Sequence, residues 1–146
     1  MWMCDVNVLV AGFRIDHSQH SLHRGCLRAL QRGPAALAWS DLVLSGFLRV
    51  VTGPKAFSPP STQAEALAFL DALLATPGSV QLRPGPQHWR LFRDLLAATG
   101  ARGKLVPDAY HAALAIEHNC DWVTSDGDFQ RFRGLRTIHP ARLVQP

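Results

Sequence analysis

The sequence predicts an α/β fold, a three-layer α/β/α sandwich around a five-stranded, mainly parallel sheet. Two observations lead to this prediction. Short apolar segments with strand character alternate with amphipathic segments of about a dozen residues, which is the order of βαβ units. Gly and Pro cluster between these segments, as in Gly53-Pro54 and Pro77-Gly78, and so mark loops. We expect a single domain over residues 1–146.

The first half of the chain predicts two strands and three helices. In the second helix, Leu22, Cys26 and Leu30 recur at helical spacing, and Gly33-Pro34 ends it. Ser40 has the side chain of a helix N-cap and precedes an apolar helix. The expected elements are a strand at 2–5, helices at 6–13 and 18–31, a strand at 35–39, and a helix from 41 to Gly53.

The second half predicts three more strands and three more full-length helices. We expect Ser61 to cap one helix, Gly100 to close the next, and Pro107 to begin the third. The expected elements are a helix at 62–75, a strand at 80–82, helices at 87–98 and 107–118, a strand at 121–124, a short helical turn at 126–132 and a strand at 136–139.

Composition indicates a basic intracellular protein. The chain has 15 Lys and Arg against 11 Asp and Glu, and all the basic residues except Lys55 and Lys104 are Arg. Arg binds phosphate in a bidentate way, so this excess suits a phosphate-rich partner, although a plain basic surface explains it equally well. Cys4, Cys26 and Cys120 lack metal-ligand spacing and are expected to be buried thiols. No signal peptide or membrane span is visible, and we expect a cytoplasmic location.

Three aspartates follow strand ends or begin a helix. Asp5 ends the first strand, Asp126 follows the fourth, and Asp108 lies in the first turn of its helix. Ligands of parallel sheets bind at the carboxyl ends of the strands, so these side chains should meet there, with Asp128 close by. Asp108 alone would be interpreted as a helix cap, but Asp5 lies among apolar residues, where an isolated carboxylate is costly.

Several carboxylates at one edge repel each other unless a cation neutralises them. Oxygen-only ligands favour Mg²⁺ or Mn²⁺ over Zn²⁺. Beside an Arg-rich surface, such an ion indicates phosphodiester chemistry, because it lowers the pKa of a water molecule and stabilises the leaving oxygen.

Four segments in order resemble the PIN-domain ribonucleases, and specifically the VapC-type toxins of bacterial toxin–antitoxin pairs. They are CDVNVLV, LVLSGFLRVVT, LVPDAYHAALAIEHN and DWVTSDGDFQRF, and together they extend over nearly the whole chain. The resemblance implies a PIN-like five-stranded parallel sheet, Mg²⁺-dependent cleavage of structured RNA such as tRNA or rRNA, inhibition of translation, a homodimer, and a small VapB-like antitoxin as partner.

Carried over position by position, the resemblance makes Asp5, Asp108 and Asp126 the catalytic metal ligands. Asp128 would be an accessory metal carboxylate, and Thr124 or Ser125 could orient a ligand or a phosphate.

The sequence departs from the family pattern at one position. Many PIN nucleases have a Glu in the second of these motifs, where this chain has Gly46. Asp41 is the nearest acid. It lies about 140° around the helix from position 46, so it is more simply interpreted as a helix N-terminal acid, although it could still reach the site.

Other side chains have competing interpretations. His17, His20 and His23 have a spacing that raises zinc binding, but exposed histidines at a helix start are preferred. His111 lies one turn after Asp108 and could contact phosphate or the antitoxin, or belong to the surface or core. The tryptophans Trp39, Trp89 and Trp122 are expected in the core.

Several basic residues could hold RNA. Arg49, in the second motif, could reach the site, with a structural ion pair as the alternative. The others could line an RNA path or form a solvated face, and they are Arg102, Lys104, Arg131, Arg133 and Arg136.

We therefore expect a Mg²⁺- or Mn²⁺-dependent endoribonuclease that leaves 5′-phosphate and 3′-hydroxyl ends. The alternative is a non-catalytic PIN-like module that binds RNA or a protein partner through a weakened metal site, as Gly46 suggests. A phosphatase with Asp5 as nucleophile is disfavoured, because such enzymes usually carry a second Asp where this chain has Asn7.

Overall fold

The computed structural model describes residues 1–144 as a five-stranded sheet with helices on both sides. The strands are β1 (Trp2–Cys4), β2 (Leu37–Trp39), β3 (Val80–Gln81), β4 (Asp121–Val123) and β5 (Arg136–Ile138). The helices are α1 (Val6–Phe13), α2 (His20–Arg32), α3 (Asp41–Thr52), α4 (Gln63–Leu74), α5 (His88–Thr99) and α6 (Leu105–Glu117), with 3-10 turns η1 (Gly127–Arg131) and η2 (Pro140–Arg142).

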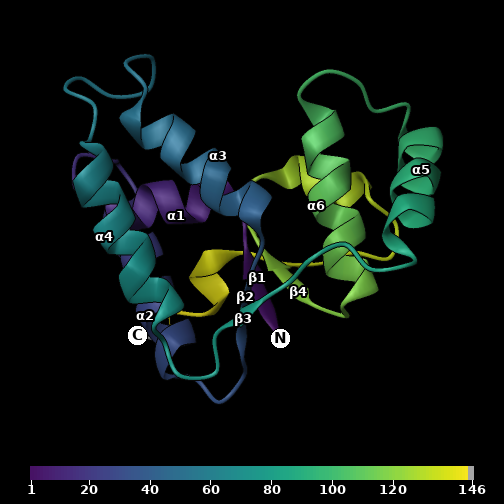
Figure 1. Cartoon of the computed structure of the whole chain (residues 1–146), viewed down its shortest axis with the longest axis horizontal. Coiled ribbons are helices and arrows are strands. Elements are labelled where there is room, and N and C mark those ends of the chain that lie inside the picture. The colour runs from purple at the N-terminus through teal and green to yellow at the C-terminus, as the bar shows by residue number, and fades with distance from the viewer. Residues whose placement is uncertain (145–146) are drawn as a thin grey trace.

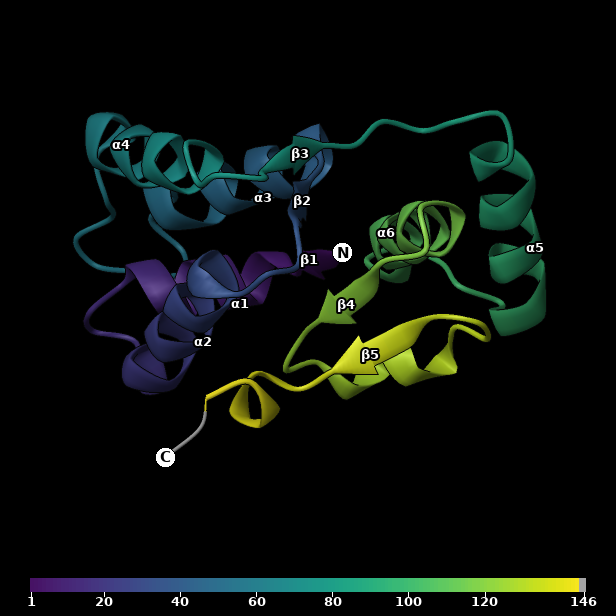
Figure 2. The same ribbon diagram turned by 90° about the horizontal axis from the view of Figure 1, so that it is seen from below.

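All strand pairs are parallel, in the order β3-β2-β1-β4-β5. Figures 1 and 2 show α1 to α4 gathered on one side of the strands and α5 with α6 on the other. The expected three-layer α/β/α sandwich is therefore confirmed. Because β1 and β4 are adjacent, with Cys4 opposite Val123, the loops that follow them meet at one edge of the sheet.

Side chains from both helical layers and the sheet form one core. Trp39, Trp122, Phe47 and Met3 are among its largest fully buried members. All three cysteines are buried and free, as expected. In the part of the chain that the structure describes, no helix is both long and apolar enough to cross a bilayer.

Three local expectations are wrong. Thr62, not Ser61, caps α4, because Thr62 and Glu65 form a reciprocal capping box while the Ser61 hydroxyl accepts a hydrogen bond from Arg14. Helix α6 begins two residues before Pro107, which is tolerated because the first turn needs no N–H partners. Trp89, expected in the core, is 66% exposed on α5, and its ring centroid lies 5.8 Å from that of Phe92.

Candidate active site

The carboxyl ends of β1 and β4 bring the predicted aspartates together. Asp5 directly follows β1 and is the N-cap of α1. Asp126 follows β4 after two residues and caps η1, where its side chain accepts the N–H of Asp128. Asp108 lies in the first turn of α6, as expected. Two adjacent parallel strands and one helix start therefore supply the three carboxylates.

Thr124 connects two of these loops through its hydroxyl group. It donates a hydrogen bond to Asp5 Oδ2 at 2.6 Å and accepts the N–H of Asp126 at 3.0 Å. Asn7 Nδ2 lies 3.4 Å from the same hydroxyl. Thr124 is buried, so this hydrogen-bonded unit holds the Asp5 carboxylate in a fixed orientation.

The three aspartates line a hollow of about 290 Å³, here called the acidic hollow. Its remaining lining residues are Val6, Asn7, Val10, His17, Val50 and Phe129. A second hollow lies beside it and shares Asp5, Val6 and Asp108. The basic residues Arg49 and Lys104 line this second hollow, together with Gly46 and His111.

The carboxyl groups of Asp5 and Asp108 both have raised pKa values. Burial raises the pKa of Asp5 to about 6, and the charges of Asp108 and Asp126 add to this, although the Thr124 hydroxyl lowers it. Burial also raises the pKa of Asp108 to about 6, with further contributions from Asp126 and Asp128, against Lys104 and Arg131. The acidic hollow therefore holds more negative charge than its protein surroundings compensate.

The donor chemistry of the acidic hollow fits a hard divalent cation. Within residues 1–144, no three Asp, Glu, His or Cys side chains close on one point as a ready-made metal cage. Mg²⁺ in proteins usually keeps several waters and takes only one or two carboxylates, so a roomy hollow lined by carboxylate and amide oxygens suits it. The Asn7 Oδ1 atom is buried without a hydrogen-bond partner among the described residues, which leaves a further oxygen donor there.

Two other acids stand apart from this group. Asp128 is paired with Arg131 at 2.8 Å and does not line the acidic hollow, although its charge acts on Asp108. Asp41 is exposed in the first turn of α3, where it accepts a hydrogen bond from Gln81, and it lines neither hollow. The interpretation of Asp41 as a helix N-terminal acid is thus confirmed, and its possible reach into the site is not.

Close packing between α3 and α1 explains why position 46 is a glycine. A Cβ atom at this position would lie 3.0 Å from Val6 Cγ2, so the missing side chain lets α3 approach α1 closely. A carboxylate at position 46 would require Val6 to move. Among residues 1–144, the only acids that line the second hollow, where Gly46 lies, are Asp5 and Asp108. No other acid takes the place of the Glu that many family members have at this position.

The histidines divide into structural and site-lining groups. His20 Nδ1 contacts the carbonyl of Ala11, and His23 lies buried between Gln19 O and Ser125 Oγ, so the expectation of an exposed side chain is wrong for His23. These two rings are held by contacts within the protein, and no three metal-binding side chains converge among residues 1–144, so the zinc alternative is wrong as well. His111 is buried and stacks on Trp122, and burial lowers its pKa to about 4. It is therefore a neutral core histidine that borders the second hollow.

The basic residues that could hold RNA lie in different parts of the molecule. Arg49 and Lys104 lie at the second hollow, next to Asp5 and Asp108. Arg102 is exposed in the loop before α6, and Arg131 is paired with Asp128. Arg136 bonds Asp121 and Asn119 at the amino ends of β4 and β5, away from the aspartates at the carboxyl ends, which favours a structural role for it; its place on an RNA path stays a prediction.

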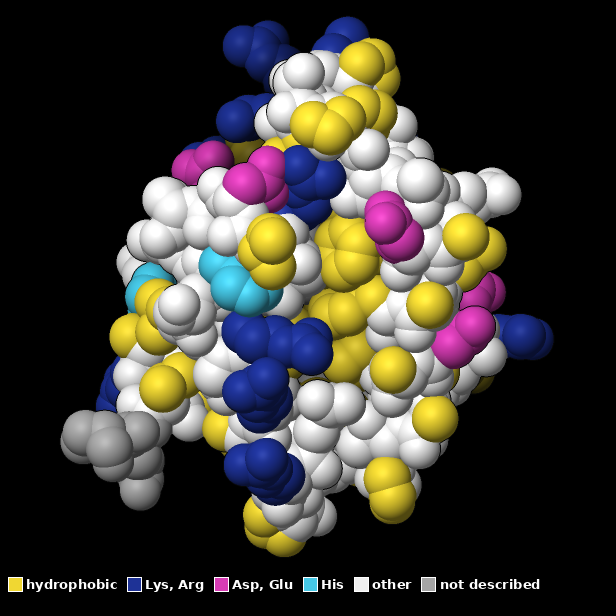
Figure 3. All heavy atoms as spheres, turned by 90° about the vertical axis from the view of Figure 1, so that its left-hand side faces the viewer, with side chains coloured by type: hydrophobic (Ala, Val, Ile, Leu, Met, Phe, Trp, Pro, Cys, Tyr) yellow, Lys and Arg dark blue, Asp and Glu magenta, His cyan; other side chains and the backbone are white. Residues whose placement is uncertain are grey.

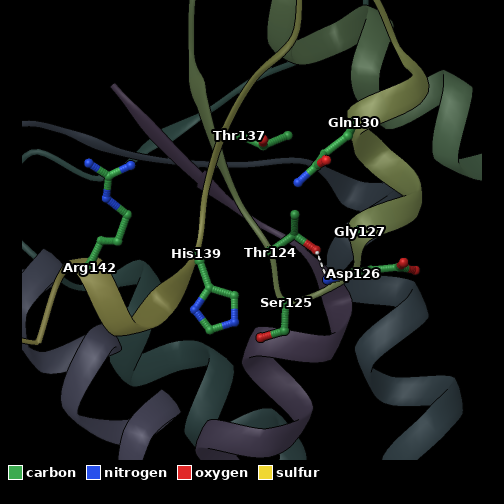
Figure 4. Close-up of a pocket in the computed structure, with 8 residues that line it drawn as sticks. All are labelled: Thr124, Ser125, Asp126, Gly127, Gln130, Thr137, His139 and Arg142. Atoms are coloured by element: carbon green, nitrogen blue, oxygen red, sulfur yellow. Dashed lines mark hydrogen bonds between the residues drawn. The ribbon is translucent and has the colours of Figure 1, made fainter.

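The sequence did not predict a cavity at the ends of β4 and β5, although Thr124, Ser125 and Asp126, which line it, were expected at the site. A cavity of about 210 Å³, here called the His139 cavity, lies at the carboxyl ends of β4 and β5. Figure 4 shows the residues that line it. Its lining residues are Thr124, Ser125, Asp126, Gly127, Gln130, Thr137, His139 and Arg142. The strand-end rule that found Asp126 could also have found His139, which follows β5 directly.

Comparisons with known proteins agree with this geometry. The PIN domain family model matches residues 2–135. Ribonuclease VapC43 of Mycobacterium tuberculosis is 44% identical over 140 residues, covering 96% of this chain and 95% of the relative. Ribonuclease VapC31 of the same species is 40% identical over 140 residues, with 96% and 99% covered.

Solved structures show the same fold at lower identity. VapBC2 from Rickettsia felis, bound to a DNA fragment from its promoter, matches with a TM-score of 0.68 at 20% identity, covering 94% of this chain and 97% of that one. Mycobacterium tuberculosis VapC20, described as a Sarcin-Ricin loop cleaving toxin, matches with a TM-score of 0.65 at 17% identity, covering 93% and 99%. The family model, the two ribonuclease relatives and the carboxylates at the sheet edge agree, and this chain belongs to the PIN-domain family, among the VapC-type ribonucleases.

Proposed function

We propose that this chain, as a single domain over residues 1–146, is a Mg²⁺- or Mn²⁺-dependent endoribonuclease toxin that cleaves structured RNA, tRNA or rRNA, in the cytoplasm and thereby inhibits translation. One observation carries the proposal. Asp5 is 7% exposed, lines a hollow together with two further aspartates, and has no basic partner among residues 1–144. Its excess negative charge calls for a cation, and the relatives that match at 44% and 40% identity are named ribonucleases.

In this proposal Asp5, Asp108 and Asp126 hold the metal ion, with Asp128 acting on them through its charge. When bound, a divalent ion would activate a water molecule for attack on phosphorus and stabilise the leaving oxygen. Thr124 keeps Asp5 oriented through its 2.6 Å hydrogen bond, and Asn7 Oδ1 offers an acceptor for a water or a ligand. The apolar side chains Val6, Val10 and Val50 wall the acidic hollow and limit bulk water.

The basic residues of the second hollow would bind the RNA backbone. Arg49 and Lys104 line the space that opens beside Asp5 and Asp108, so a phosphate held there lies next to the carboxylates. Arg102, just before α6, and Arg131, at the end of η1, are exposed. They would attract the RNA backbone at long range rather than bind it in a fixed contact.

The non-catalytic alternative rests on Gly46, which leaves the acidic group one carboxylate short of the family pattern. Close packing of Gly46 against Val6 explains that residue without a loss of chemistry. The matching relatives at 40% and 44% identity are ribonucleases by name, which favours the catalytic interpretation.

A cleavage assay with a matched control tests the proposal. Purified wild-type protein with Mg²⁺ or Mn²⁺ should cleave a mixture of tRNA and rRNA, and EDTA should stop the reaction. Asp5→Asn should abolish cleavage and weaken Mn²⁺ binding measured by calorimetry. Asp71→Asn is the control, because Asp71 is exposed on α4 and lines neither hollow. Undiminished cleavage in EDTA, or equal Mn²⁺ affinity in both variants, would refute the metal mechanism.

A VapB-like antitoxin is the proposed protein partner of a homodimer. Figure 3 shows apolar side chains exposed along a shallow hollow on the side of the molecule that carries α4, with Lys and Arg in a column beside it. The guanidinium of Arg24, on α2, lies over the ring of Phe69, on α4, 5.8 Å from its centroid. A short neighbouring gene product that copurifies with this chain and relieves its toxicity would support the partner, whereas harmless expression of the chain alone would refute the toxin role.

A further inference from the structure

The His139 cavity lies beside the acidic hollow, and Asp126 lines both. At about 210 Å³ it is smaller than the roughly 300–1,000 Å³ of sites that enclose a whole small molecule. A space of this size next to the catalytic carboxylates suits one part of a polymeric substrate better than a free metabolite.

Ser125 presents a hydrogen-bond acceptor to this cavity. The Nδ1 atom of His23 lies 3.0 Å from the carbonyl oxygen of Gln19, which can only accept, so Nδ1 carries the proton. Burial lowers the pKa of His23, so the ring is neutral near pH 7 and its Nε2 accepts the hydroxyl proton of Ser125 at 2.8 Å. The Ser125 oxygen is then left with its lone pairs for a ligand.

His139 presents a hydrogen-bond donor to the same cavity. As the N-cap of η2, its Nδ1 accepts the N–H of Ala141 at 3.2 Å, which places the ring proton on Nε2. Nε2 has no hydrogen-bond partner in residues 1–144. Figure 4 shows the His139 ring beside the Ser125 hydroxyl at one end of the cavity.

One acceptor and one donor of fixed polarity form the complement of a hydroxyl group, which both donates and accepts. In a nucleic acid, the 2′-hydroxyl is such a group, and it is the feature that distinguishes RNA from DNA. Arg142 also lines the cavity, and no acid among residues 1–144 pairs with it, so no described carboxylate competes with a phosphate for its charge.

We propose that the His139 cavity receives the ribose of a nucleotide next to the cleaved phosphate, with Ser125 accepting from the 2′-hydroxyl, His139 donating to it, and Arg142 contacting the adjoining phosphate. The cavity thus selects RNA over DNA. This inference rests on the proposed ribonuclease function and adds to it the group by which the substrate class is recognised.

The test measures binding rather than cleavage. Asp5→Asn serves as the parent, and the probes are a labelled single-stranded RNA of about 12 nucleotides and a DNA of the same sequence, compared by fluorescence anisotropy in EDTA. The parent should bind the RNA about 5- to 30-fold more tightly, as one or two hydrogen bonds allow. Adding Ser125→Ala or His139→Asn should reduce this ratio to near one by weakening RNA binding alone.

The variants contain their own controls. His139→Asn keeps an N-cap acceptor for Ala141, so it removes the donor and retains the local fold. Ser21→Ala, on the exposed face of α2, should change the affinity for neither probe.

Arg142→Gln should weaken the binding of RNA and of DNA by the same factor, because both probes carry the phosphate. Thermal unfolding checks Ser125→Ala, which leaves His23 Nε2 unpaired.

The outcomes are distinguishable from those of the cleavage assay. If the parent binds both probes equally, or if its RNA preference persists in Ser125→Ala and in His139→Asn, the cavity does not recognise the 2′-hydroxyl and the inference is wrong. If wild-type protein cleaves no RNA with Mg²⁺ or Mn²⁺ while the binding preference behaves as expected, the nuclease proposal fails and the ribose site remains.

Discussion

The two ends of the sheet treat their carboxylates differently. At the amino ends of β4 and β5, Asp121 is bonded to Arg136 at 2.5 Å. Nearby, Glu117 at the end of α6 accepts the N–H groups of Gly85 and Gln87, each at 2.9 Å. At the carboxyl ends, Asp5 has the Thr124 hydroxyl but no cation among residues 1–144. Charge is compensated at one end and left in excess at the other.

This difference separates structural acids from functional ones better than residue type does. Burial tends to raise the pKa of Glu117, yet the two N–H donors lower it below the ordinary value, so its ionised form stabilises the fold. The ionised form of Asp5 does the opposite, because burial and two neighbouring aspartates raise its pKa to about 6. A protein keeps such a destabilising charge where a ligand compensates it.

The largest expected effect comes from neutralising Asp5. Asp5→Asn should lower kcat/KM for RNA by about a thousandfold or more, equal to about 4 kcal/mol of lost transition-state stabilisation. The same substitution should raise the melting temperature in EDTA, because it removes an uncompensated buried charge. A variant that loses activity and also unfolds more easily would show that Asp5 is structural.

The second prediction concerns pH. The folded-state pKa of Asp5 lies above its ordinary value of 3.8, so the folded protein binds the proton more tightly than the unfolded chain. In EDTA the free energy of unfolding should therefore fall by about 3 kcal/mol as pH rises from about 4 to 6, and level off above that. Unfolding monitored by circular dichroism measures this slope.

Mn²⁺ and Asp5→Asn should each remove most of this slope, because one neutralises the carboxylate and the other deletes it. Asp108, which is half-buried and has a pKa of about 6, should leave a smaller residual slope of the same sign. An identical pH profile with and without Mn²⁺ would contradict the assignment of this end of the sheet to a cation.

Much of this contrast could be predicted from the sequence. Strand ends and helix starts are local features, so hydrophobic periodicity is enough to place Asp5, Asp108 and Asp126 at one edge of the sheet. The cap of α4 is harder to assign, because Ser61 and Thr62 are both good caps. The choice between them depends on a distant residue, Arg14, which takes the Ser61 hydroxyl.

The compensated end and the His139 cavity could not be predicted in the same way. Whether Arg136 meets an RNA or pairs with Asp121 depends on the register of β4 and β5, which sequence pattern does not specify. The His139 cavity needs η2 to lie near α2 so that His23 can hold Ser125. The hydrogen bond between His23 and Ser125 joins residues about a hundred positions apart in the sequence, and no local motif predicts such a pair.

A smaller effect is expected at Glu117. Its side chain is 8% exposed and holds the start of α5 through two charge-assisted hydrogen bonds. Glu117→Gln should lower the free energy of unfolding by about 1–2 kcal/mol near pH 7 while leaving RNA cleavage unchanged. Because the pKa of Glu117 is lowered on folding, wild-type stability from this residue should disappear as pH falls below its ordinary value of 4.5. Lost activity in a stable variant would contradict the separation of the two ends.

The smallest effect is expected for Arg136→Gln, which tests whether compensation at the amino end matters at all. The Arg136 side chain is 54% exposed and that of Asp121 26% exposed, so solvent and salt screen the pair. Its loss should cost less than about 1 kcal/mol of stability, and less still at high salt. Cleavage and RNA affinity should not change, because this arginine faces the edge opposite the carboxylates. If Arg136→Gln instead weakened RNA binding as strongly as Arg49→Gln does, RNA would contact both ends of the sheet, and the carboxyl edge alone would no longer define the binding surface.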